Sequence, residues 1–82
     1  MLGRRSESPS RHVVVLGSTG SIGRQALDIV GSMPDILVTG LAAGSDAATL
    51  YSQAASYGVR LVGLQRGARD LAARAPSLTV FE

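Results

Sequence analysis

The chain of 82 residues contains no cysteine, no tryptophan and no lysine. The lack of cysteine excludes a disulfide framework and any thiolate metal site, and it fits a reducing cytoplasm. No apolar run approaches the roughly 20 residues that a membrane-spanning helix needs. We therefore expect a cytoplasmic protein that does not insert into a membrane.

The net positive charge is also small, because six acidic residues oppose the eight basic residues. All eight basic residues are arginines. The arginines form no basic stripe, and few aromatic side chains are available to stack on bases, so nucleic acid is not expected as a partner. The single histidine, His12, has no second metal ligand beside it. Asp28, Asp35 and Asp70 lie apart and are most simply interpreted as solvated charges.

Glycine, in contrast, is abundant, and three of the ten glycines fall in the segment GSTGSIG at residues 17–23. An apolar run at residues 12–16 precedes this segment and an amphipathic stretch follows it. A strand that passes through glycines into a helix is typical of a nucleotide-phosphate loop, since the helix N-terminus directs unpaired N–H groups and a positive dipole beyond the strand. The alternative is a plain connecting turn.

Each residue of this segment has an expected role. Gly17 permits a tight turn, Gly20 lets a pyrophosphate approach the backbone, and Gly23 lets the helix pack closely on the strand. Hydroxyl groups that would meet phosphate oxygens come from Ser18, Thr19 and Ser21. We expect the helix to begin within one or two residues of Ser21, with the N–H groups of Gly20, Ser21 and Ile22 open to solvent.

The remaining sequence predicts alternating strands and helices. We expect a disordered tail over residues 1–11 and one partial α/β domain over residues 12–82. Strands are expected at 12–16, 36–42, 59–64 and 78–81, and helices at 21–32, from 47 to the stop signal Gly58, and at 65–75. This order implies a parallel sheet in which the first three strands have the order 3-2-1 and the fourth lies beyond the third.

The apolar spacing also predicts which faces are buried. The run at 12–16 predicts a strand buried on both faces. The predicted inward faces of the three helices are Ile22, Ala26, Ile29, Val30 and Met33 in the first, Ala47, Leu50, Tyr51, Ala54 and Ala55 in the second, and Ala68, Leu71, Ala72 and Ala75 in the third. A chain of this size buries little surface, so we expect the truncated first half of a Rossmann-like sheet that belongs to a longer protein or is completed by a partner.

The end of the second predicted strand bears on the choice of cofactor. In NAD sites an acidic residue about 20 positions past the glycines accepts the ribose 2′-hydroxyl. Here the strand tip carries no carboxylate, and the small residues leave room for a phosphate at Ser45 and the N–H groups of the next helix. This favours NADP over NAD. Asp46 has two possible roles, as a helix cap or as a ligand of the bare ribose.

The runs VVVLGSTGSIGRQALDIV and VTGLAAG resemble the amino-terminal NADPH-binding domain of the 1-deoxy-D-xylulose-5-phosphate reductoisomerases, over residues 13 to about 81. The resemblance implies contacts to the cofactor pyrophosphate from Thr19, Gly20, Ser21 and Ile22, and to its adenosine end from Gly44, Ser45 and Asp46. Many members of that family carry Lys-Asn where this chain has Ser45-Asp46.

The resemblance further implies an oxidoreductase and isomerase of non-mevalonate isoprenoid biosynthesis. As a full-length enzyme it would convert 1-deoxy-D-xylulose 5-phosphate to 2-C-methyl-D-erythritol 4-phosphate with NADPH and a divalent metal, Mg or Mn, and it is compatible with a homodimer. The family's catalytic residues and metal ligands lie downstream, so none of either is expected in this chain, and no turnover by it alone. The alternatives are another NAD(P)-dependent reductase or epimerase, and a non-catalytic module that senses a dinucleotide.

Overall fold

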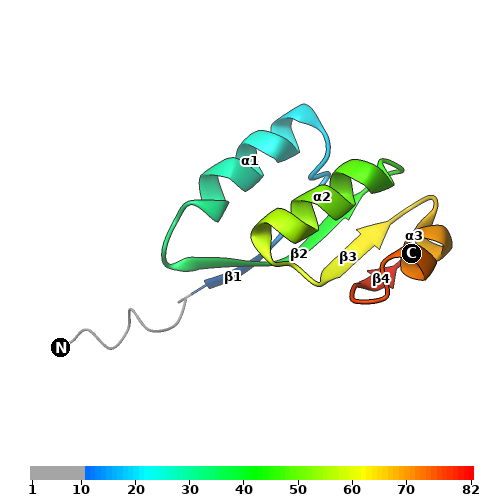
Figure 1. Cartoon of the computed structure of the whole chain (residues 1–82). Helices are drawn as coiled ribbons and strands as arrows, with labels where there is room; N and C mark the ends of the chain where they lie inside the picture. Colours follow the sequence, from blue (N-terminus) through cyan, green and yellow to red (C-terminus); the bar gives the residue numbers. More distant parts are fainter. Residues whose placement is uncertain (1–10) are drawn as a thin grey trace.

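A computed structural model describes residues 11–82 of the chain (Figure 1). The tail expected over residues 1–11 lies outside the described residues, apart from Arg11, which begins the first strand. The elements are β1 (Arg11–Leu16), α1 (Ser21–Gly31), β2 (Ile36–Ala43), α2 (Ala47–Tyr57), β3 (Leu61–Leu64), α3 (Ala68–Arg74) and β4 (Thr79–Phe81). The alternation of strands and helices predicted from the sequence is confirmed.

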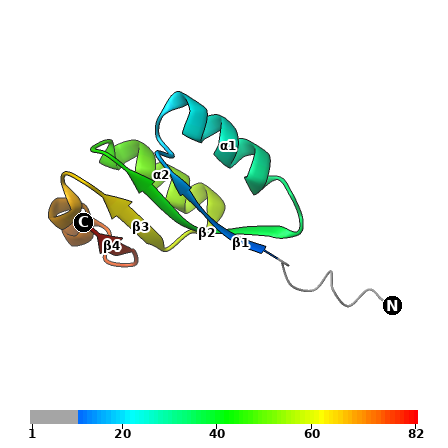
Figure 2. The same cartoon turned by 180° about the vertical axis from the view of Figure 1, so that it is seen from behind.

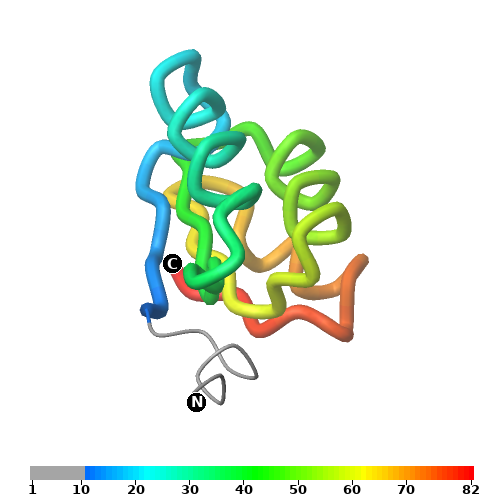
Figure 3. Tube along the Cα trace, turned by 90° about the vertical axis from the view of Figure 1, so that its left-hand side faces the viewer, coloured from blue at the N-terminus to red at the C-terminus, as the bar shows by residue number. Residues whose placement is uncertain are grey.

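The four strands form one parallel sheet in the order β1-β2-β3-β4, which confirms the predicted topology. Each strand lies beside the strand that precedes it in the chain, and right-handed crossovers then place the connecting helices on one face of the sheet. Helices α1 and α2 lie side by side over that face (Figures 1 and 3). From behind, β1 and β2 are seen in front of α2 with no described helix over them (Figure 2).

The core lies between this covered face and the helices. Val15, Leu41 and Val62 are paired in register across the first three strands, and each is at most 9% exposed. The helices contribute Leu27, Leu50 and Leu71 to the same cluster. Burial of these apolar side chains supplies most of the favourable free energy of folding.

The expectation that β1 is buried on both faces is wrong for the described residues. The outward side chains Val14 and Leu16 are 55% and 75% exposed, whereas their neighbour Val15 is buried. β1 is an edge strand, and no described helix covers its second face. A continuous apolar run therefore indicates that both faces of a strand are apolar. It does not indicate that residues of the same chain cover both faces.

The predicted buried face of α1 is also wrong in part. Ile22, Ile29 and Met33 are exposed, whereas Gly23 and Leu27 are buried. The physical reason is that Gly23 packs directly on the preceding loop, and this contact sets the rotation of the helix. In α2 and α3 the predicted Leu50, Ala54, Ala68, Leu71 and Ala75 are buried, while Tyr51, Ala55 and Ala72 are exposed.

Element boundaries differ from prediction mainly around β3 and α3. Gly58 ends α2 in the left-handed conformation (φ 68°), as a glycine after a helix often does. β3 begins at Leu61, two residues later than expected, and α3 begins at Ala68, because Gly67 (φ 89°) precedes it in a turn. Among residues 11–82 no helix is long and apolar enough to cross a bilayer.

Candidate functional site

The candidate site lies where the first three strands end. Here a cavity of about 470 Å³ is lined from β1 and its loop by Leu16 and Gly17, from β2 by Ala43 and Gly44, and from β3 by Leu64. The two predicted segments, 17–23 and 44–46, therefore meet at one edge of the sheet. The N–H of Ser18 donates to the carbonyl of Ala42 (3.0 Å), which ties the first loop to β2. Ligands of open parallel sheets bind at this carboxyl edge.

Two of the three glycines of the loop are required by the chain itself. Gly17 has a φ of 66°, a conformation that costs an L-residue about 1–2 kcal/mol. A Cβ on Gly23 would lie 1.9 Å from the carbonyl oxygen of Gly17. The glycine at position 23 thus allows the first turn of α1 to rest on the loop that follows β1, whereas the sequence predicted close packing on the strand itself.

Gly20 differs, because nothing within the described chain requires a glycine there. Its backbone is extended (φ −79°, ψ 170°), and an added Cβ would meet only the oxygen of Gly17 at 3.5 Å, an ordinary contact. Its N–H donates to the carbonyl of Gly17 (3.1 Å) and closes a turn. The expectation that the Gly20 amide is open is therefore wrong, because the loop uses this donor itself.

The N-terminus of α1 has no internal cap. Gly20 occupies the N-cap position without a side-chain hydrogen bond, and the first turn contains no acidic residue. Ser21 and Ile22 are exposed, and their N–H groups have no acceptor within residues 11–82. α1 begins at Ser21, which confirms the predicted start. This helix end has the free donors and the positive dipole that an anion needs.

The hydroxyl of Ser18 does not face this end, which corrects the prediction for that residue. Ser18 is completely buried, and its Oγ has no hydrogen-bond partner. Its carbonyl accepts a hydrogen bond from Nε2 of Gln53 (2.7 Å), so the loop is held beneath α2 at this point. Thr19 is partly exposed and Ser21 is exposed, which leaves these two hydroxyl groups accessible.

The second loop, at residues 44–46, is exposed on all three residues. Asp46 caps α2, since its Oδ1 accepts the N–H of Thr49 (3.1 Å). The hydrogen bonds from Thr49 lower the pKa of Asp46, and the charge of Arg24 lowers it further. Of the two roles that the sequence left open, the helix cap is the one present in the structure.

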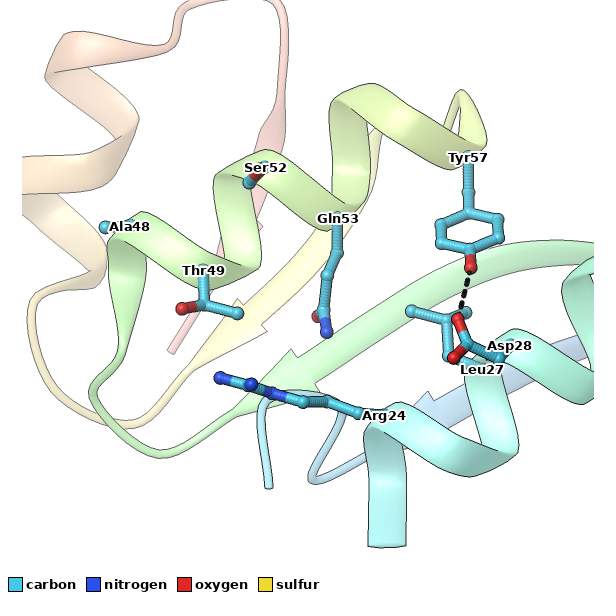
Figure 4. A pocket seen from close by; sticks show the side chains of 8 residues that line it. All are labelled: Arg24, Leu27, Asp28, Ala48, Thr49, Ser52, Gln53 and Tyr57. Atoms are coloured by element: carbon cyan, nitrogen blue, oxygen red, sulfur yellow. Dashed lines mark hydrogen bonds between the residues drawn. The ribbon is translucent and has the colours of Figure 1, made fainter. Parts of the chain in front are cut away.

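The structure adds two residues that the sequence reasoning did not place in the site. Arg24 donates from Nε to the carbonyl of Thr19 (3.0 Å), and Gln53 holds the carbonyl of Ser18. Both line a groove of about 540 Å³ between α1 and α2 (Figure 4). Arg24 directly follows the third glycine, which was a usable signal. Gln53 is 35 residues from its partner and carries no such signal.

Two acidic residues outside the loops, Asp28 and Asp70, have structural partners. Asp28 on α1 accepts the hydroxyl of Tyr57 on α2 (3.0 Å), a contact shown in Figure 4. Asp70 pairs with Arg74 across one turn of α3 (3.3 Å). Within the part of the chain that the structure describes, no three His, Asp or Glu side chains gather as metal ligands do.

A parallel sheet, a glycine turn at its carboxyl edge and an uncapped helix N-terminus together define the dinucleotide-binding class of α/β domains. The comparisons with known proteins narrow this class. The model of the 1-deoxy-D-xylulose 5-phosphate reductoisomerase family matches residues 13–78, so the chain belongs to that family.

Individual relatives agree with the family match. The chain is 55% identical over 58 residues to the reductoisomerase of Leifsonia xyli, which covers 70% of this chain and 16% of the relative. It is 41% identical over 75 residues to the same enzyme of Synechocystis, which covers 88% of this chain and 19% of the relative. The chain thus spans less than a fifth of the length of these relatives.

A solved structure supports the fold assignment. The reductoisomerase of Zymomonas mobilis in complex with NADPH has a TM-score of 0.76 and 26% sequence identity to this chain, and the match covers 90% of this chain and 21% of that one. The Rossmann-like parallel sheet predicted from the sequence is therefore confirmed by a relative as well as by the strand order.

Proposed function

We propose that this chain is the NADPH-binding region of a 1-deoxy-D-xylulose 5-phosphate reductoisomerase. The observation that carries the proposal is the open N-terminus of α1, where Ser21 and Ile22 present N–H groups unpaired within residues 11–82, beside a glycine that no contact of the described chain requires. A diphosphate is the part of the cofactor that such a helix end binds. Family membership and the likeness to an NADPH complex support the same conclusion.

The predicted residues divide into two groups under this proposal. Ser21, Ile22 and the Thr19 hydroxyl receive the pyrophosphate and Gly20 leaves space for it, while Gly44, Ser45 and Asp46 lie at the adenosine end. Gly17 and Gly23 act indirectly, since they shape the loop and the start of the helix. When bound, NADPH supplies the hydride, and the chain's own residues bind and orient it.

The reaction of the whole enzyme is proposed from the family alone. It is the isomerisation and reduction of 1-deoxy-D-xylulose 5-phosphate, a small sugar phosphate. Residues 11–82 offer no cluster of ligands that fits a divalent metal, so no step is assigned here to a metal.

Calorimetric titration of the 82-residue chain with NADPH tests the proposal. We expect weak binding to the wild type and at least a tenfold loss in Gly20→Ala, because the new Cβ occupies the approach path of the diphosphate. Gln25→Ala, an exposed change on the same helix, is the matched control. Equal melting temperatures by circular dichroism would show that all three chains fold alike. Absence of NADPH binding to the wild type, or undiminished binding to Gly20→Ala, would contradict the proposal.

A further inference from the structure

Arg24 uses only part of its hydrogen-bonding capacity within residues 11–82. It lies in the first turn of α1, directly after Gly23, and its Nε donates to the carbonyl of Thr19 (3.0 Å). The side chain is exposed and extends from α1 toward the first turn of α2, where Thr49 lies (Figure 4). Its two Nη groups donate to no residue within 11–82. The fork of the guanidinium is thus fixed on one side and free on the other.

The free side of Arg24 is directed toward the first turn of α2, which follows the second loop of the site (Figure 4). Arg24 and Thr49 line the same groove, and Thr49 donates to Asp46 at the end of that loop. The charge of Arg24 also contributes to the lowered pKa of Asp46, after the hydrogen bonds from Thr49. Arg24 therefore holds the glycine loop by a hydrogen bond, and it lies close enough to the end of the second loop for its charge to act on Asp46.

The space between these two loops is where the adenosine ribose lies in dinucleotide-binding folds, and an acidic residue there selects NAD whereas an arginine accommodates the 2′-phosphate of NADP. Asp46 has one oxygen committed to the cap of α2. The chain has no lysine to offer at Ser45 or elsewhere. A guanidinium with free donors can bind a phosphate through two parallel hydrogen bonds.

Arg66 is the rival cation at the same edge. Its N–H donates to the carbonyl of Gly44 (2.9 Å), so its backbone also lies beside the second loop. It follows β3, however, on the side of that loop away from the glycine turn. Within residues 11–82 no hydrogen bond joins Arg66 to the glycine loop, so Arg66 serves as a matched control of equal charge.

We propose that Arg24 binds the 2′-phosphate of NADPH and sets the preference for NADPH over NADH. The inference rests on the proposed function, because it assigns a specificity residue to the same cofactor site. It predicts that substitution of Arg24 weakens the binding of NADPH, which carries the 2′-phosphate, more than the binding of NADH. The diphosphate contacts at the N-terminus of α1 are common to both cofactors.

The test is calorimetric titration of wild type, Arg24→Gln, Arg24→Lys and Arg66→Gln with NADPH and with NADH. We expect Arg24→Gln to weaken NADPH binding about tenfold or more relative to NADH binding, as loss of a charge-assisted bidentate contact requires. Arg24→Lys should retain part of the preference, and Arg66→Gln should retain all of it. Melting temperatures confirm that each variant is folded.

The possible failures are distinguishable. Equal weakening of NADPH and NADH by Arg24→Gln would overturn the inference alone, because Arg24 would then act by holding the carbonyl of Thr19. A larger loss of preference in Arg66→Gln would also overturn it. A wild type that binds neither cofactor would overturn the proposed function, and the inference with it.

Discussion

The chain contains two turns that lead from a strand into a helix at the same edge of the sheet, and they are built in opposite ways. Between β2 and α2, Asp46 caps the helix and accepts the N–H of Thr49. Between β1 and α1, a glycine occupies the cap position, and Ser21 and Ile22 keep their N–H groups unpaired. A folded chain normally satisfies helix ends with its own side chains. The exception at α1 is the helix end that the proposed function assigns to the cofactor diphosphate.

The glycines of the two turns make the same contrast. A Cβ on Gly23 would collide with the loop, whereas a Cβ on Gly44 would reach no atom closer than Oε1 of Gln65 at 3.9 Å. The first turn of α1 thus packs directly on the backbone of its loop, whereas the loop before α2 leaves space for a side chain at Gly44. Tight packing fixes the open donors of α1 in place, and this preorganisation favours binding.

The largest expected effect is that of Gly23→Ala. Its methyl group would lie 1.9 Å from the oxygen of Gly17, so the loop or the helix must shift. We expect a loss of about 3 kcal/mol in the free energy of unfolding, as for severe overpacking, and loss of NADPH binding. Gly44→Ala is the control and should change stability by less than about 0.5 kcal/mol. Urea denaturation measures both, and equal stability of the two variants would remove the contrast between the turns.

Gly17→Ala should have a smaller effect on stability. The residue would be forced to a φ of 66°, which we expect to cost about 1–2 kcal/mol. Gly58→Ala imposes the same strain (φ 68°) at the far end of α2. Both variants should lose similar stability in thermal denaturation, but only Gly17→Ala should also weaken NADPH binding. If Gly58→Ala weakened binding as much, the effect would come from stability rather than from the loop.

Gln53→Leu tests the hydrogen bond that connects α2 to the glycine loop. The change removes the donor to the carbonyl of Ser18 and leaves that buried oxygen unpaired, which costs about 1 kcal/mol. Part of this cost is offset, because Oε1 of Gln53 is itself buried without a partner. We expect faster hydrogen exchange at the Ser18 N–H, and no change in Ser52→Ala on the same face of the groove. Unchanged exchange in Gln53→Leu would mean that the loop is held without α2.

The smallest effect is expected at the capped turn. The folded pKa of Asp46 is lowered, so its carboxylate contributes stability above the unfolded pKa, and the contribution is lost as the pH falls through the folded value. Asp46→Asn keeps an oxygen for the Thr49 N–H but has no charge to titrate. The difference in melting temperature between wild type and Asp46→Asn should therefore be constant near neutral pH and shrink below about pH 4. A difference that grew on acidification would contradict the sign of the shift.

The two turns also differ in what their sequences reveal. GSTGSIG identifies the loop and the start of α1, because positive φ and close packing are local demands. The alternation of strands and helices along the chain predicts the parallel topology. The buried face of α1 was not predictable from periodicity, since the contact of Gly23 with Gly17 sets the helix rotation. The burial of Ser18 and its bond to Gln53 depend on α2, which lies far along the chain. For Asp46 two roles were open from the sequence, and the structure places Oδ1 at the cap of α2.

The most direct test of this account follows the backbone amides of both helix N-termini by NMR during titration of the 82-residue chain with NADPH. The amide signals of Ser21 and Ile22 should show the largest changes and saturate together, while the Thr49 amide should change less because Asp46 continues to accept its hydrogen bond. The opposite result would contradict the account: a Thr49 signal that moves as Asp46 turns to the ribose, with Ser21 and Ile22 unchanged while NADPH binds.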